Sequence, residues 1–202
     1  MRTVKGGLLS LGLVGIVGTL TACGGAAPGG GPAGGAAAGG GGGAVTVSDP
    51  NWETMSAPGV SVSFAMPKPI KMHDDAQNGM VVYVAQKPEQ KLSFKVGIVK
   101  RNLDQDRAKG MDDEAVLKTF AQRLLQASRE QLAQQYHIQT QFQFDGSTQV
   151  NGALCHQYEA KAGKAIILNR FYINNQGIFW IEAITQDPNN ADIQQFLNSF
   201  AI

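Results

Sequence analysis

The sequence has few cysteines, few histidines and almost no net charge, and each shortage excludes a class of protein. Only Cys23, Cys155 and 3 histidines occur among 202 residues, so neither a disulfide framework nor a Cys/His-rich zinc module is expected. The formal net charge is +1. Two basic residues, Arg2 and Lys5, lie in the N-terminal stretch, and no acidic residue precedes Asp49. The rest of the chain is therefore close to neutral and lacks the charge that nucleic acids or anionic lipids attract.

Motifs of the common catalytic and nucleotide-binding sites are also missing. The sequence contains no nucleophile elbow, zinc-binding helix, phosphate loop or dinucleotide fingerprint. His73, His137 and His156 are separated by 64 and 19 residues, which matches no common metal-ligand spacing. We therefore predict no catalytic residue, no cofactor and no metal ligand, and we expect the protein not to be an enzyme.

The N-terminal apolar run is too short for a membrane-spanning helix. It extends from Gly6 to Leu20 after the basic residues Arg2 and Lys5, and its length of about 15 residues falls short of the roughly 20 that a span needs. A basic start, a short apolar stretch and small residues near the end are typical of an export signal. An uncleaved anchor is the less favoured alternative, because nothing basic or aromatic flanks the far end.

The string Leu20-Thr21-Ala22-Cys23 resembles the lipobox of bacterial lipoproteins. In that family the cysteine sulfur receives a diacylglyceryl group, and cleavage falls directly before the cysteine. The resemblance implies a signal peptide over residues 1–22 and lipidation at Cys23. Two or more acyl chains hold a protein stably on a bilayer, since each buried methylene contributes about 0.8 kcal/mol. We expect a lipid anchor in a membrane of the bacterial cell envelope, inner or outer, with the domain on the extracytoplasmic side.

A low-complexity tract follows the expected lipidation site. From Gly24 to Gly43 the chain contains only glycine, alanine and proline, and such a segment has no side chains with which to build a core. Residues 23–44 are therefore expected to be a disordered tether. Residues 45–202 then form a single domain, large enough to bury a core. With Cys23 lipidated, Cys155 has no partner for a disulfide.

Hydrophobic periodicity predicts three strands in the first half of that domain. Apolar residues alternate from Val60 to Met66 and from Leu92 to Ile98, and they run almost continuously over 80–85. The continuous run favours a central position in a sheet. The polar stretch 71–79 is expected to be a loop.

A long amphipathic helix is predicted next, roughly from Glu114 to Gln135, covering one face of the sheet. Acidic residues at its start suit the positive end of the helix dipole. A further strand with alternating apolar residues begins at Ile138 and is expected to end before Asp145-Gly146.

The last part of the chain predicts a hairpin-rich sheet and a final helix. Turn signals at Asn151-Gly152, at Gly163 and at 174–177 separate strands of an antiparallel meander of three or four strands. Asn189 or Asn190 can cap the final helix. Its apolar stripe consists of Ile193, Phe196, Leu197 and Phe200.

Three groups of residues invite a chemical interpretation, and each has a structural alternative that we favour. Cys155-His156 suggests a nucleophile and a base, but neighbours in a strand point to opposite faces, so Cys155 is expected in the core. His73 with Asp74 and Asp75 could form a loose cation site, yet a solvated loop explains them equally well. The acidic stretch around Asp112 lacks the order of a calcium loop and is interpreted as a charged loop and helix start.

The aromatic residues could line a binding cleft or fill the core, and we favour the core. If helices cover both faces of the sheet, the consecutive residues Phe179 and Trp180 are both buried, whereas an open face would expose one of them. The predicted surface is rich in glutamine, which is compatible with a protein partner; the residues are Gln122, Gln126, Gln131, Gln134, Gln135, Gln139, Gln141 and Gln143. The aromatic set is Trp52, Tyr136, Tyr158, Phe171, Tyr172, Phe179 and Trp180.

The order of these elements resembles the PsbP-like family, and within it the DcrB type of small bacterial lipoprotein. The resemblance covers about Trp52 to Ile202 and rests on Trp52, the strand that ends at Pro67, the long helix, the late meander and the terminal Phe196-to-Phe200 segment. It implies an α+β fold, an α/β/α sandwich in which helices cover a mostly antiparallel sheet. It also implies a binding or assembly module, and it supplies no ligand residues to transfer.

These observations together predict a membrane-anchored envelope lipoprotein that binds a partner protein or supports a complex without catalysis. The tether would raise the effective concentration of the domain at the membrane. The first alternative is a small-ligand or metal-binding lipoprotein associated with transport, which requires a concave pocket with convergent polar groups. The second is a hydrolase, which requires Cys155, His156 and a carboxylate clustered within hydrogen-bond reach.

Overall fold

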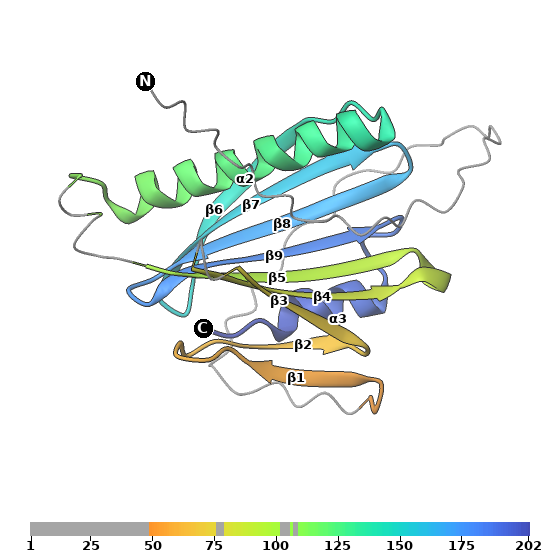
Figure 1. Ribbon diagram of the computed structural model, residues 1–202, viewed down its shortest axis with the longest axis horizontal. Helices are drawn as coiled ribbons and strands as arrows, with labels where there is room; N and C mark the ends of the chain where they lie inside the picture. The colour runs from red at the N-terminus through yellow and green to blue at the C-terminus, as the bar shows by residue number, and fades with distance from the viewer. Residues whose placement is uncertain (1–48, 76–78, 102–105, 107–108) are drawn as a thin grey trace, which may run out of the picture. The chain divides into compact units, whose positions relative to one another are not determined.

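The computed structural model describes residues 49–202 except 76–78, 102–105 and 107–108 (Figure 1). The expected signal peptide, Cys23 and the expected tether lie outside the described residues, so lipidation and tethering remain predictions. Within the described part of the chain, no helix has both the length and the hydrophobicity needed to cross a membrane.

Nine strands are described, and all pair antiparallel. Two form a small sheet in the order β1-β2, and seven form the main sheet in the order β3-β4-β5-β9-β8-β7-β6. Their bounds are β1 Trp52–Ser56, β2 Ser63–Pro67, β3 Ile70–Asp75, β4 Met80–Lys87, β5 Leu92–Lys100, β6 Phe142–Val150, β7 Ala153–Ala162, β8 Ala165–Ile173 and β9 Gly177–Thr185.

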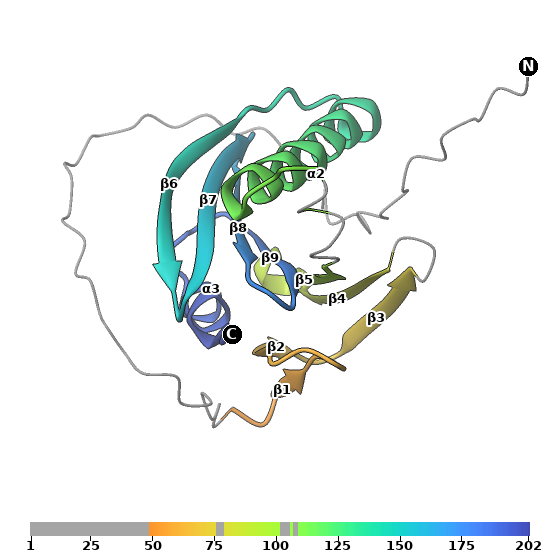
Figure 2. The same cartoon turned by 90° about the vertical axis from the view of Figure 1, so that its left-hand side faces the viewer.

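Helices lie against both faces of the main sheet. Helix α2 (Asp113–Tyr136) packs on β7 and β8, whereas α3 (Ala191–Ser199) packs on β9 and β2. A short 3-10 helix, η1 (Pro88–Gln90), joins β4 to β5. Figure 2 shows α2 on one side of the curved sheet and α3 together with β1 and β2 on the other. The predicted α+β architecture is confirmed, with the addition that β1 and β2 share the covering of the α3 face.

The α3 face holds an aromatic core. The rings of Phe94 and Phe196 meet edge to face with centroids 5.2 Å apart, and Trp52 packs edge-on against Phe94 at 5.9 Å. Farther along, Phe200 stacks on Tyr172 at 4.8 Å. Such ring pairs add about 0.5–1.5 kcal/mol each beyond the area they bury. The predicted apolar stripe of α3 therefore faces the core.

On the α2 face a glycine makes room for a tryptophan. Trp180 of β9 lies opposite Gly97 of β5, and a Cβ built on Gly97 would come within 1.9 Å of the indole Cη2 atom. The indole therefore lies flat across the glycine, where any side chain would displace it. Phe120 of α2 contacts this indole with centroids 5.9 Å apart. Phe179 and Trp180 are both buried, as expected for a sheet covered on both faces.

Both ends of α2 are fixed by specific interactions. Asp112 caps the first turn by accepting a hydrogen bond from the Ala115 backbone N–H at 2.8 Å. Arg101, at the end of β5, pairs with Asp106 at 2.8 Å and with Asp113 at 2.7 Å. At the other end, His137 adopts a left-handed conformation and stops the helix. The described acidic residues near the helix start thus form a cap and ion pairs, which agrees with the predicted charged helix start and adds specific partners to it.

Several sequence predictions are wrong in the first half of the domain. The stretch 71–79 contains strand β3, which pairs with β4 over Ile70–Asp75 and forms one edge of the sheet. Its polar sequence reflects the exposure of an edge strand, not a loop. β4 is therefore second from the edge instead of central, and it owes its apolar character to the cover that β2 provides on one face. The first predicted strand begins three residues later than Val60, and β1 was not predicted.

The second half follows the sequence more closely. α2 covers the predicted range with one extra residue at each end, and the meander β6-β7-β8-β9 has the expected turns at Asn151-Gly152, at Gly163 and at 174–177. Asn190 caps α3 through its side chain, as expected. The strand predicted from Ile138 begins at Phe142 and does not end at Asp145-Gly146, because a β-bulge there lets it continue to Val150.

Candidate functional site

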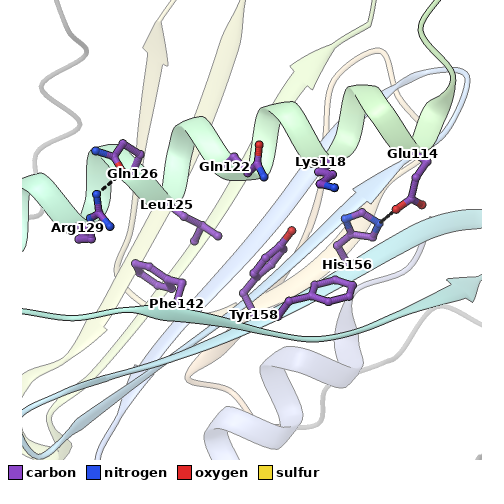
Figure 3. Close-up of a pocket in the computed structure, with 10 residues that line it drawn as sticks. Glu114, Lys118, Gln122, Leu125, Gln126, Arg129, Phe142, His156 and Tyr158 are labelled. Carbon is purple, nitrogen blue, oxygen red and sulfur yellow. Dashed lines mark hydrogen bonds and ion pairs between the residues drawn. The ribbon is translucent and has the colours of Figure 1, made fainter.

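A groove lies between α2 and the outermost strands β6 and β7. Its volume is about 570 Å³, within the range of ligand-binding clefts. The lining combines a polar rim on the helix with an apolar floor on the strands (Figure 3). The lining residues are Glu114, Lys118, Gln122, Leu125, Gln126, Arg129, Phe142, Phe144, His156 and Tyr158.

The rim follows one stripe of α2. Glu114, Lys118, Gln122 and Gln126 are each four residues apart, so they share one face of the helix. Arg129 closes the far end of the stripe. At 1.5 Å per residue, the stripe from Glu114 to Arg129 extends over about 22 Å. The groove is thus long and narrow, and Figure 3 shows these side chains along the helix above the strand residues.

The floor is aromatic. Phe142 and Phe144 come from β6 and Tyr158 from β7, all on the sheet face that α2 covers. The rings of Phe144 and Tyr158 have centroids 5.3 Å apart, and Tyr158 packs edge-on against Phe171 beneath α2 at 5.7 Å. Burial, and to a smaller extent the negative charge of Glu114, raises the pKa of Tyr158 above its ordinary value. Tyr158 is therefore a neutral hydroxyl on an apolar surface.

His156 is the most buried polar residue of the groove. It is only 2% exposed and projects from β7 toward α2 (Figure 3). Its Nε2 lies 3.0 Å from Glu114 Oε1, an ion-pair distance, but neither ring nitrogen makes a hydrogen bond of regular geometry with a described residue. A buried polar atom without a partner costs about 1–3 kcal/mol. The imidazole therefore lies beneath the groove at ion-pair distance from Glu114, with both ring nitrogens buried.

The rim carries one negative and two positive side chains. Glu114 lies at the His156 end, and Lys118 follows one turn later with no hydrogen-bond or ion-pair partner among the described residues. At the other end, Arg129 donates a hydrogen bond to Gln126 Oε1 at 2.6 Å. The rim therefore carries one more positive than negative side chain.

Strand β6 borders the groove and is also an open edge of the main sheet. No strand in the described part of the chain pairs with its outer side. Phe144 is 56% exposed, and among the residues that the structure describes it is one of two large apolar side chains with high exposure; the other is Met72 on the opposite edge, at 61%. A bulge at Asp145 interrupts the register with β7 beyond Phe144. Edge strands usually carry charges, prolines or bulges that limit pairing; β6 has this bulge and the single charge of Asp145, and it has no proline.

Cys155 and His156 do not form a catalytic pair. Cys155 is 1% exposed and belongs to the core on the α3 face, whereas His156 faces α2. Burial raises the pKa of the Cys155 thiol from 9.0 to about 11, so the reactive thiolate is disfavoured. The prediction that Cys155 is a small core residue is confirmed. It is a free thiol in the described part of the chain.

The structure also shows where the histidine–aspartate group and the aromatic residues lie. His73 and Asp74 lie on β3, not in a loop, and the described residues contain no cluster of three or more His, Cys, Asp or Glu side chains that could hold a metal ion. Of the aromatic set, five residues are buried in the core, whereas Tyr158 lines the groove and Tyr136 is half-buried at the end of α2. The five are Trp52, Phe171, Tyr172, Phe179 and Trp180.

The sequence analysis singled out several residues of the groove, but it did not predict that they lie together. Gln122 and Gln126 belonged to the glutamine-rich surface, Glu114 to the helix start, and His156 to a rejected catalytic pair. Phe144 was expected to be the last apolar residue of its strand. The helical stripe of four-residue spacing was visible in the sequence, but the strand that it faces depends on sheet order, which periodicity does not encode.

The fold is similar to that of a protein whose structure has been solved. The solution structure of cyanobacterial PsbP (CyanoP) from Synechocystis sp. PCC 6803 superimposes with a TM-score of 0.50 at 15% sequence identity, covering 81% of this chain and 98% of that one. The PsbP-like fold is thereby established. At this identity the similarity shows the fold alone.

A second similar structure is a protein of unknown function, PA94, from Pseudomonas aeruginosa, described as a putative regulator. It shares 12% identity over 74% of this chain and 90% of its own, with a TM-score of 0.31. Comparison with protein-family profiles and with curated protein sequences gives no match.

Proposed function

We propose that this chain is a non-catalytic, lipid-anchored envelope protein of DcrB type that binds a partner protein through the groove between α2 and β6. The observation that supports it best is the groove itself. It combines an exposed aromatic floor, a partly unpaired polar rim and an open strand edge in one place. Exposed apolar surface rimmed by polar residues is typical of interaction sites.

Two further features support binding over catalysis. The thiol of Cys155 and the imidazole of His156 face opposite sides of the sheet, so the nucleophile and base that a hydrolase needs are kept apart. The lipobox-like string ending at Cys23 would fix the protein to a bilayer. A tether then makes even a weak interface effective, because the domain and its partner share one surface.

Site-specific cross-linking in intact bacteria tests this proposal. A photoreactive residue replaces Gln122 on the rim, or Arg123 beside it on the same helix but outside the groove lining. We expect a discrete cross-linked protein from position 122 and none from position 123. Equal patterns from both positions, or cross-links from neither, would refute partner binding through the groove.

The anchor has its own test. Cys23→Ser should leave the precursor unprocessed and unlabelled by radioactive palmitate, whereas the natural chain is processed and labelled. Normal processing and labelling of the variant would refute the anchor. The cross-linking result from position 122 concerns the groove and can be interpreted independently of this outcome.

A second candidate function is the binding of a small ligand for transport. The observation that favours it is the buried His156, whose ring nitrogens lack regular hydrogen bonds inside a cleft of suitable volume. Native mass spectrometry of the purified full chain would reveal a bound small molecule. Loss of that mass in a His156→Phe protein that remains folded would support this function.

A further inference from the structure

The outer edge of β6, which borders the groove, has no pairing strand in the described part of the chain. β6 spans nine residues, Phe142–Val150, and is the terminal strand of the sheet on that side. The groove beside it is about 22 Å long, the distance covered by about six or seven residues of an extended chain. Sheet edges of this kind bind extended peptides in several recognition domains, in which a helix borders the added strand.

From these dimensions we propose that the groove receives an extended segment of a partner protein as an additional β-strand, paired with β6 and running beside α2. This inference rests on the proposed function and specifies how the groove binds. Backbone hydrogen bonds to β6 would supply affinity. Side chains that point into the groove would supply specificity.

The side chains of the groove indicate what sequence the segment has. Alternate residues of an added strand point to the same face as Phe142 and Phe144, so they meet the aromatic floor. Apolar residues at those positions bury the exposed ring of Phe144. The rim on α2 carries the ammonium group of Lys118, which has no partner among the described residues, and Arg129 lies at the far end of the rim. The segment is therefore apolar at alternate positions and carries an acidic side chain that reaches the rim of α2.

The bulge in β6 determines which part of its outer edge can pair with an added strand. Asp145 is the extra residue between Phe144 and Gly146, and Gly146 adopts a φ of +151° that favours glycine. Pairing is regular from Ser147 to Val150. The added strand thus pairs with 147–150 and passes Phe144 at the bulge, where the floor is most exposed.

A peptide-display library tests this proposal with the full chain in detergent micelles. Random eight-residue peptides are selected, and the enriched sequences should show apolar residues at alternate positions and an acidic residue. Hydrogen–deuterium exchange with a selected peptide should then slow backbone amides within 147–150, the part of β6 that pairs with the added strand. The other edge, β3, should be unaffected. Failure to enrich any peptide, or protection outside β6, would overturn the proposal.

Matched variants distinguish pairing at the β6 edge from nonspecific hydrophobic binding. Phe144→Ser should weaken the peptide about tenfold or more, whereas Met72→Ser, the other highly exposed apolar residue, should leave binding unchanged. Lys118→Glu should weaken an acidic peptide by a similar factor, and a peptide with lysine in place of its acidic residue should recover binding to that variant. Arg123→Glu serves as the charge control on α2. Equal loss in both members of either pair contradicts the proposal.

The outcomes also distinguish this inference from the function on which it rests. A cross-linked partner at position 122 together with unprotected β6 amides overturns strand addition and leaves partner binding intact. No cross-link from position 122 overturns both. Slowed exchange in β6 that depends on protein concentration and needs no peptide identifies a second copy of the chain as the occupant, which contradicts a heterologous partner. A co-purifying small molecule that excludes the peptide contradicts it as well.

Discussion

The two faces of the main sheet are built differently. On the α3 face, aromatic rings pack in a continuous core, and the buried polar residues Thr185 and Ser199 are hydrogen-bonded to backbone atoms at 2.8 Å, although Trp52 Nε1 lacks a partner among the described residues. On the α2 face, His156 and Asn169 are buried with side-chain nitrogen or oxygen atoms that no described residue satisfies. The outer part of that face opens into the groove.

This contrast indicates which face of the sheet mainly stabilises the fold and which face is suited to binding. A face on which most buried polar groups are satisfied and the aromatic rings interlock should contribute more to the free energy of folding than a face with several unsatisfied polar groups. A face that leaves polar groups buried and unpaired loses some of that free energy, and such sites often have a function that compensates for it. We therefore expect substitutions on the α3 face to act on stability and substitutions around the groove to act on binding.

The largest effect is expected for Phe196→Ala. Phe196 is fully buried and packs on Phe94, so its loss leaves a cavity in the α3-face core. The free energy of unfolding should fall by about 3–5 kcal/mol. Urea denaturation followed by tryptophan fluorescence or circular dichroism measures it. A loss below about 1 kcal/mol would show that this face is not the main source of stability.

Gly97→Ala is expected to have the next largest effect. The new methyl group would overlap the Trp180 indole, which must move within a packed layer, at a cost of about 1–3 kcal/mol. The same substitution in a Trp180→Leu background should cost less, because the overlapping ring atoms are gone. An equal cost in both backgrounds, measured by denaturation, would mean that the close approach of Trp180 is not the cause.

Alkaline pH should weaken the α3-face core. Burial raises the pKa of Cys155 from 9.0 to about 11 and also raises that of Tyr172. As the pH rises, the unfolded chain loses these protons before the folded chain does. The stability that the raised pKa values contribute is therefore fully present below about pH 9 and declines as the pH rises toward 11. Each group contributes a slope of up to about 1.4 kcal/mol per pH unit. Cys155→Ala should make the decline shallower in denaturation curves, and an unchanged slope contradicts the assignment.

A smaller change in stability is expected for Asn169→Leu. Both amide atoms of Asn169 are buried without a described partner, so an apolar side chain of similar size should leave the free energy of unfolding unchanged or raise it by about 1–2 kcal/mol. Thr185→Val, on the opposite face, removes a hydrogen bond to the Asp187 carbonyl and should lower it by about 1 kcal/mol. If both variants lose stability, the two faces do not differ in how well their buried polar groups are satisfied.

The sequence predicted the α+β fold and most of the second half because those strands are joined by strong local turns. Asn151-Gly152 has positive φ at both residues, as two-residue hairpin turns require. The first half was less predictable, since β3 is an edge strand exposed on much of its surface, with no alternation to reveal it. Gly97 looked like an ordinary strand residue, and only its pairing with Trp180 explains it.

The candidate site was predictable only in parts. Its helix stripe from Glu114 to Arg129 follows from helical periodicity, but its floor depends on which strand lies at the sheet edge. The bulge at Asp145 extended β6 beyond the expected turn and placed Phe144 inside a strand, next to the groove. Long-range pairing of this kind is set by the tertiary structure and leaves no local signal.

The most direct test of the separation between the two faces is the cross-linking yield from position 122 in the Phe144→Ser protein, compared with its free energy of unfolding. Phe144 is largely exposed, so we predict an unfolding free energy within about 0.5 kcal/mol of the natural chain. The yield should fall to the background of position 123. A full cross-linking yield in this stable variant would contradict the assignment of the groove as the binding surface.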